Sequence, residues 1–71
     1  MATLPHDYNI DDRVKVPIPK IPGLAIGEIK KVLNEKTRLR EEAGYFVKIE
    51  NPTELKDKLF YFPQRFIKEL L

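Results

Sequence analysis

Hydrophobic and polar residues alternate along most of this chain, and the alternation predicts β-strands. The stretch RVKVPI (residues 13–18) places Val14, Val16 and Ile18 on one side, with charged or proline residues between them. This two-residue period is typical of a half-buried strand. The same pattern recurs in GYFVKIEN (44–51) and KLFYF (58–62). A chain built from such segments is predicted to be all-β.

A further strand is predicted over residues 25–33 (AIGEIKKVL), with one irregularity. Gly27 and Ile29 share a face, but the next apolar residue, Val32, follows Ile29 by three positions and breaks the alternation. A β-bulge corrects a slip of this kind and bends the strand. Gly27 itself indicates a place where a neighbouring backbone passes close by.

The last two of these strands are rich in aromatic residues, which we assign to two faces. Alternation separates the two sets, and we expect the aliphatic-rich set to point inward. The inward set is Tyr45, Val47, Ile49, Leu59 and Tyr61, and the outward set is Phe46, Lys48, Glu50, Phe60 and Phe62.

The C-terminal segment is the most apolar part of the chain. Pro63 is expected to end the preceding strand and to open a short helical turn, since proline tolerates the first helical position. Phe66, Ile67 and Leu70 follow at helical spacing. We expect these three side chains to fold back and plug an open end of a barrel.

Two internal segments are predicted to connect strands, and the N-terminus is predicted to be a tail. PIPKIPG (17–23) has too many prolines for a central strand and predicts a stiff extended loop. Residues 34–44 (NEKTRLREEAG) are polar and contain one large apolar residue, Leu39. They fit a short helix or a long charged loop, and both alternatives stay open. We expect residues 1–9 to be a flexible tail and residues 10–71 to be one domain.

The order of these segments carries a resemblance. The run Phe62-Pro63-Gln64-Arg65-Phe66-Ile67 resembles the end of Src-homology-3 domains, where an aromatic–proline pair leads through a one-turn helix into the last strand. DDRVKV and IGEIKKV are similar to the first two strands of such barrels. The resemblance implies a small five-stranded Src-homology-3-like barrel with a short helical turn near its C-terminus. The chain lacks the tryptophan with which Src-homology-3 domains bind proline-rich peptides.

Composition argues against catalysis and metal binding. The 71 residues include no Cys, no Ser and one His, His6. Without a thiol or a serine hydroxyl, the chain has few nucleophiles, and a single histidine cannot form a ligand cluster. The three glycines are scattered and form no phosphate-binding loop. We therefore expect a non-enzymatic protein with no cofactor and no metal.

Charge and hydropathy limit the location and the partners. The net charge is +2, and basic residues are spread along the chain rather than gathered in a block. No apolar run approaches the length of a membrane span, and the first residues do not resemble a secretion signal. We expect a cytoplasmic protein, or one of the plastid stroma.

The outward aromatic residues suggest docking. An exposed aromatic patch on so small a chain needs cover, which a partner protein or an identical chain supplies. The sequence therefore predicts an adaptor or accessory subunit of a larger complex. The alternative is binding of single-stranded DNA or RNA by base stacking beside lysine and arginine. The predicted partner-binding residues are Phe46, Lys48, Phe60, Phe62 and Arg65.

Overall fold

The computed structural model describes residues 2–71 and consists of antiparallel strands with two short 3₁₀ turns. The strands are β1 (Arg13–Pro17), β2 (Leu24–Leu33), β3 (Gly44–Asn51), β4 (Leu59–Pro63) and β5 (Glu69–Leu70). The turns are η1 (Thr53–Leu55) and η2 (Gln64–Phe66). The prediction of a five-stranded, all-β fold is confirmed.

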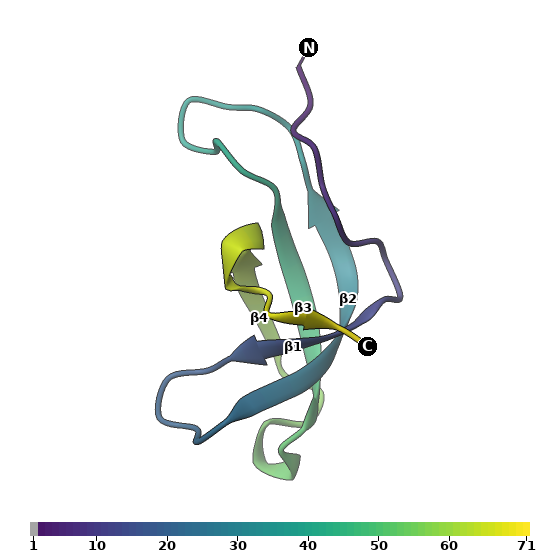
Figure 1. Ribbon diagram of the computed structural model, residues 1–71, viewed down its shortest axis with the longest axis vertical. Coiled ribbons are helices and arrows are strands. Elements are labelled where there is room, and N and C mark those ends of the chain that lie inside the picture. Colours follow the sequence, from purple (N-terminus) through teal and green to yellow (C-terminus); the bar gives the residue numbers. More distant parts are fainter. Residues whose placement is uncertain (1) are drawn as a thin grey trace.

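All five strands belong to one sheet, in the order β4-β3-β2-β1-β5. The first half of β2 pairs with β1, from Leu24 opposite Pro17 to Glu28 opposite Arg13, whereas its pairing with β3 reaches Leu33. Figure 1 shows β1 and β5 crossing the long strands β2 and β3 at a steep angle. Within the described residues no pairing joins β4 to β5, so the sheet has two free edges.

The bend of β2 coincides with two irregularities in its pairing with β3. The register shifts between Ile26 and Gly27 and again between Ile29 and Lys31, and the second shift is the predicted bulge. A Cβ atom at Gly27 would lie 2.5 Å from Cγ1 of Val47 and 2.8 Å from the carbonyl oxygen of Lys48. The prediction of a close backbone approach at Gly27 is confirmed, and only glycine fits there.

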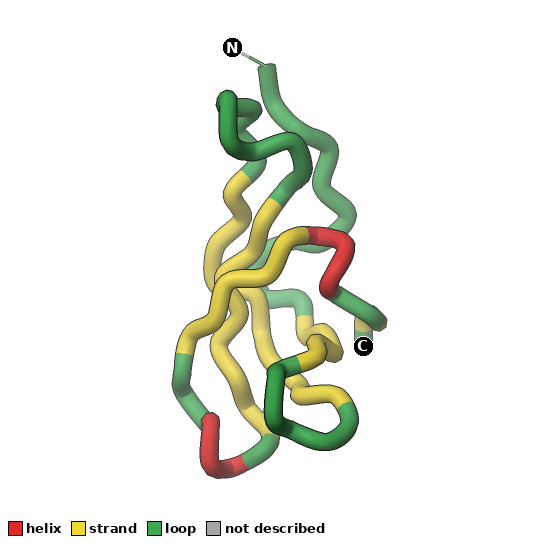
Figure 2. Tube along the Cα trace, turned by 90° about the vertical axis from the view of Figure 1, so that its left-hand side faces the viewer, coloured by secondary structure: helices red, strands yellow, loops and turns green. Residues whose placement is uncertain are grey.

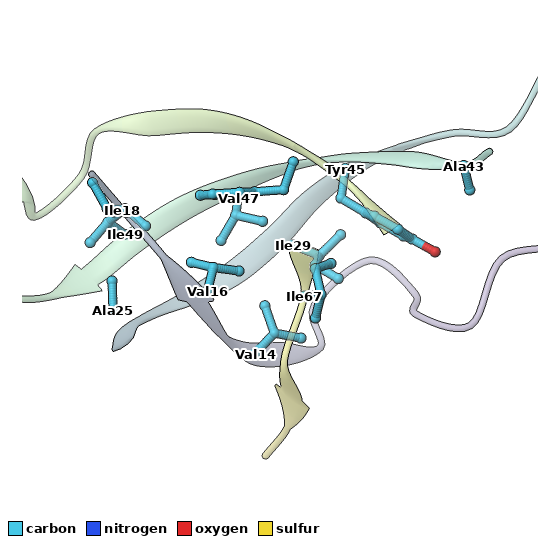
Figure 3. Packing of buried hydrophobic residues seen from close by; sticks show 11 residues of the cluster. Val14, Val16, Ile18, Ala25, Ile29, Ala43, Tyr45, Val47, Ile49 and Ile67 are labelled. Carbon is cyan, nitrogen blue, oxygen red and sulfur yellow. The ribbon is translucent and has the colours of Figure 1, made fainter. Parts of the chain in front are cut away.

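The core lies on the concave side of the sheet. Figure 3 shows buried side chains from β1, β2 and β3 converging there, with Ile67 reaching in from the C-terminal segment. At about 1.5–3 kcal/mol for each fully buried large apolar side chain, this cluster is the main source of stability. Its members are Val14, Val16, Ile18, Ala25, Ile29, Ala43, Tyr45, Val47, Ile49, Phe62 and Ile67.

The C-terminal segment follows the predicted path but buries less than predicted. Pro63 ends β4, η2 follows it, and β5 then pairs with β1. Ile67 is buried, whereas Phe66 and Leu70 keep 43% and 52% of their surface exposed. The expectation that all three plug the core is wrong for two of them. Phe66 lies on the outside of the short turn, and Leu70 lies on an edge strand that nothing covers.

The segment between β2 and β3 is a loop, so of the two alternatives the helix is wrong. Its apolar residue Leu39 is 94% exposed and anchors nothing. A short helix needs tertiary contacts to persist, and this segment offers no apolar face for them. Gly44 does not end a helix but begins β3.

The N-terminal segment runs beside the far half of β2, as Figure 1 shows. Thr3 forms a bridge with Glu35, and the N–H of Leu4 donates to the carbonyl of Asn34 at 2.6 Å. Leu4 is buried, and the ring of Tyr8 meets that of Tyr45 edge to face at 5.5 Å. The described part of the predicted tail, residues 2–9, thus makes side-chain and backbone contacts with the sheet.

Candidate functional site

Strand β4 presents its side chains the opposite way from the prediction. Phe62 lies opposite Tyr45 and Phe60 lies opposite Val47. Directly opposed residues in an antiparallel pair share a face, and Tyr45 and Val47 are fully buried. Phe62 is therefore buried and Phe60 packs against the core, whereas Leu59 and Tyr61 are exposed. The assignment of Phe60 and Phe62 to an outward patch is wrong.

The other three predicted site residues do lie on the outside, with Phe46 and Lys48 on the same face of β3. Phe46, on the outer face of β3, meets Tyr61 edge to face at 5.6 Å. Lys48 is exposed and pairs with Asp57 at 3.5 Å. Arg65, on η2, forms an ion pair with Glu42. The five predicted residues therefore form no single surface.

A different apolar hollow lies between β4 and the end of β1. It has a volume of about 430 Å³, and Tyr61 and Phe66 on its wall keep 44% and 43% of their surface exposed. Figure 2 shows η1 and η2 at opposite ends of β4, so the strand itself spans this side of the molecule. We call this hollow the β4 groove. Its lining residues are Pro17, Ile18, Pro19, Phe60, Tyr61, Phe62 and Phe66.

Four of the seven residues that line the groove are held in place. Pro17 and Pro19 have fixed φ angles, and Phe60 and Phe62 are held by the core. The guanidinium of Arg65 lies 5.0 Å from the centre of the Phe66 ring, within the range of a cation–π contact. A preformed apolar surface of this kind costs little entropy when a ligand binds.

A second hollow, of about 810 Å³, lies on the other side of Tyr61. It is formed by the loop between β2 and β3 together with Tyr61, Pro63 and Arg65, and its wall carries charges of both signs. Because Tyr61 lines both hollows, its ring is the partition between them.

A buried phenol fixes the end of the sheet above the groove. The hydroxyl of Tyr45 donates to Oε1 of Gln64 at 2.5 Å and accepts from the N–H groups of Asp7 and Tyr8 at 3.2 and 3.4 Å. Gln64 in turn donates to the Asp7 carboxylate at 3.1 Å. Burial raises the pKa of Tyr45, against the opposing effect of the two N–H donors. The network joins β3, η2 and the N-terminal segment.

The potential metal-ligating side chains of the described residues do not gather in one place. No group of three or more potential metal-ligating side chains occurs within residues 2–71. The ring of His6 contacts the side-chain amide of Asn34 at 3.3 Å and no carboxylate. No helix in the described part of the chain is long and apolar enough to cross a membrane. What the geometry offers is a shaped apolar surface.

The predicted partner-binding set includes two residues of the groove lining, Phe60 and Phe62, and lacks the others. The sequence analysis places Tyr61 in the core, Phe66 in a plug, and Pro17 and Pro19 in a loop. One signal favours the observed orientation of β4: phenylalanine is fully buried more often than tyrosine, which carries a hydroxyl group. Nothing in the local sequence pattern indicates that β4 lies next to the proline-rich segment 17–23.

Comparison with family models, with curated proteins and with solved structures finds no match to this chain.

Proposed function

We propose that this protein is a non-catalytic interaction module that docks onto a partner protein through the β4 groove. The observation that carries the proposal is an apolar groove with two half-exposed aromatic rings and no charged lining residue. Protein interfaces favour aromatic anchors in their buried centre, with charged residues depleted there.

The architecture supports the same proposal. A five-stranded antiparallel sheet with its last strand beside its first, and a 3₁₀ turn between β4 and β5, is compatible with a Src-homology-3-like barrel. Small barrels of this type commonly serve as adaptors or accessory subunits. Fold alone does not fix function, so the groove and not the topology carries the argument.

Site-specific photo-crosslinking tests the proposal in cells of the source organism. A benzoylphenylalanine placed at Phe66, in the groove, is expected to crosslink to a protein. The same group at Ile10 is expected to give no such product, because Ile10 is equally apolar and exposed but lies outside the groove lining.

A second substitution shows whether the groove itself is responsible. Tyr61→Ser removes an exposed ring from the groove wall and should abolish the crosslink at position 66 while the chain stays folded. Crosslinks to nucleic acid, or crosslinks of equal yield at positions 10 and 66, would contradict docking of a protein in this groove.

A further inference from the structure

The edge of β4 that borders the groove is free to accept another strand. The N–H of Ile49 donates to the carbonyl of Lys58, and the N–H of Gln64 donates to the carbonyl of Ala43. In an antiparallel ladder alternate residues turn their peptide groups toward the partner. The peptide groups of Leu59 and Tyr61 therefore point away from β3, toward the free edge of the sheet.

Basic residues flank the groove lining in the sequence, and three of them have no ion-pair partner among the described residues. Every charged residue within two positions of a lining residue is basic, and no acidic residue falls within that range. These residues are Lys15, Lys20, Lys58, Arg65 and Lys68. Lys15 pairs with Glu69 and Arg65 with Glu42, whereas the other three form no ion pair with any described residue.

We propose that the β4 groove binds an extended, acidic segment of the partner protein, which adds to β4 as an additional strand. This inference rests on the proposed function and names the chemistry of the partner. Apolar side chains of the segment fill the groove, its backbone pairs with the free peptide groups of Leu59 and Tyr61, and its carboxylates face Lys20, Lys58 and Lys68.

Charge argues against a second copy of the chain as the occupant. Pairing of β4 with β4 of another copy would bring the same cations together around one groove, and like charges so placed repel. An acidic strand from another protein avoids this repulsion.

The direct test uses the full chain and a fluorescent synthetic peptide, EEVTVTVEE, whose central part matches β4 in length. We expect binding, measured by fluorescence anisotropy, that weakens as salt is raised. The peptide KKVTVTVKK should bind at least about tenfold more weakly, because its charges repel Lys20, Lys58 and Lys68. Equal or tighter binding of the lysine peptide would overturn the inference.

Two methylated peptides test strand addition. One carries methyl groups on its valine amides and the other on its threonine amides. Because alternate amides of an added strand face β4 and solvent, one version should lose binding and the other should retain it. Equal binding of the two versions, whether strong or absent, would overturn the added strand.

Charge reversal supplies the matched protein variants. The triple variant Lys20→Glu, Lys58→Glu, Lys68→Glu should bind EEVTVTVEE roughly tenfold more weakly, as expected for the loss of three exposed ion pairs. The control triple, Lys31→Glu, Lys36→Glu, Lys56→Glu, has the same net charge but alters exposed lysines that do not flank the groove lining. Its affinity should change by less than about twofold. If the two triple variants lost affinity for EEVTVTVEE equally, Lys20, Lys58 and Lys68 would not be the residues that face the acidic peptide.

The remaining outcomes separate this inference from the proposed function. If the photo-crosslink at Phe66 persists but no acidic peptide binds, the groove still docks a protein and the acidic strand is wrong. If oligothymidylate of the same length binds more tightly than EEVTVTVEE and displaces it, nucleic acid is the ligand and both proposals fall.

Discussion

Tyr45 couples three parts of the chain through a single hydroxyl group. It donates to Gln64 on η2 and accepts from the N-terminal segment, while its ring is fully buried in the core. Burial disfavours the charged form of a phenol and so raises the pKa of Tyr45. The charge state of this one residue therefore influences the stability of the whole end of the sheet.

The raised pKa of Tyr45 predicts how stability depends on alkaline pH. The folded chain keeps the phenol neutral to a higher pH than the unfolded chain, whose tyrosine titrates near pH 10. The stabilisation is full below that pH and is lost as pH rises through the folded-state pKa. Tyr45→Phe should cost about 1 kcal/mol at neutral pH and should make this alkaline decline shallower.

Urea unfolding at neutral and alkaline pH measures both effects. Tyr61→Phe is the matched control, because the hydroxyl of Tyr61 forms no hydrogen bond with a described residue. Its unfolding free energy should follow that of the unmodified chain. Parallel alkaline curves for the Tyr45 variant and the unmodified chain would contradict the coupling.

Two glycines in the sheet are crowded for different reasons, and this predicts different costs. A Cβ at Gly27 meets the backbone oxygen of Lys48, which cannot move without breaking the pairing of β2 with β3. A Cβ at Gly44 meets only the far end of the Tyr61 ring, which can rotate aside. Gly27→Ala should therefore destabilise the fold by about 1–3 kcal/mol, and Gly44→Ala by clearly less.

Thermal unfolding of the two variants tests this difference. Gly44→Ala has a second expected effect, because the displaced Tyr61 ring changes the wall between the two hollows. It should weaken binding at the β4 groove while the chain remains folded. A larger loss of stability at Gly44 than at Gly27 would show that the Tyr61 ring is fixed in place.

At the scale of the elements, the sequence predicted where the strands lie along the chain better than which face of each strand is buried. The four longer strands, the bulge after Ile29 and the turn after Pro63 lie where the alternation placed them. In β4 the alternation is correct but both faces are aromatic or aliphatic, so the period cannot say which face is buried. The register with β3 decides this, and register is a long-range property.

The inverted face of β4 predicts the effect of truncating its side chains. Phe62→Ala should cost about 3–5 kcal/mol, because it opens a cavity beside Tyr45, and this approaches the whole stability of a small domain. Leu59→Ala, at an exposed position of the same strand, should change stability by no more than about 0.5 kcal/mol. Denaturant unfolding measures the stability of both variants. If Phe62→Ala were as stable as the unmodified chain, the predicted outward orientation of Phe62 would be correct after all.

At the scale of the whole molecule, the candidate site depends on where distant segments meet. The groove brings Pro17 and Pro19 against β4, more than 40 residues later in the chain. Local patterns describe each wall but not their meeting, which follows from the strand order and the bend of β2. This is why the sequence predicted aromatic docking in general terms, and why the predicted residues share only Phe60 and Phe62 with the groove lining.

The N-terminal and C-terminal segments both contact Tyr45 but contribute unequally to the sheet and the core, which leads to a last prediction. Removal of residues 64–71 takes away Ile67, strand β5 and the Gln64 contact with Tyr45, and should leave a chain that is unfolded or aggregates. Removal of residues 2–8 takes away the buried Leu4 and the ring of Tyr8 but leaves all five strands.

The variant that lacks residues 2–8 should therefore still melt cooperatively, at a lower temperature than the full chain. Circular dichroism melts of the two truncations measure this order of stability. Because the β4 groove contains no residue before Pro17, the N-terminal truncation should also keep its affinity for EEVTVTVEE. Loss of binding in a folded variant would mean that the N-terminal segment holds η2 and Phe66 in the position the groove needs, acting through the Asp7–Gln64 contact.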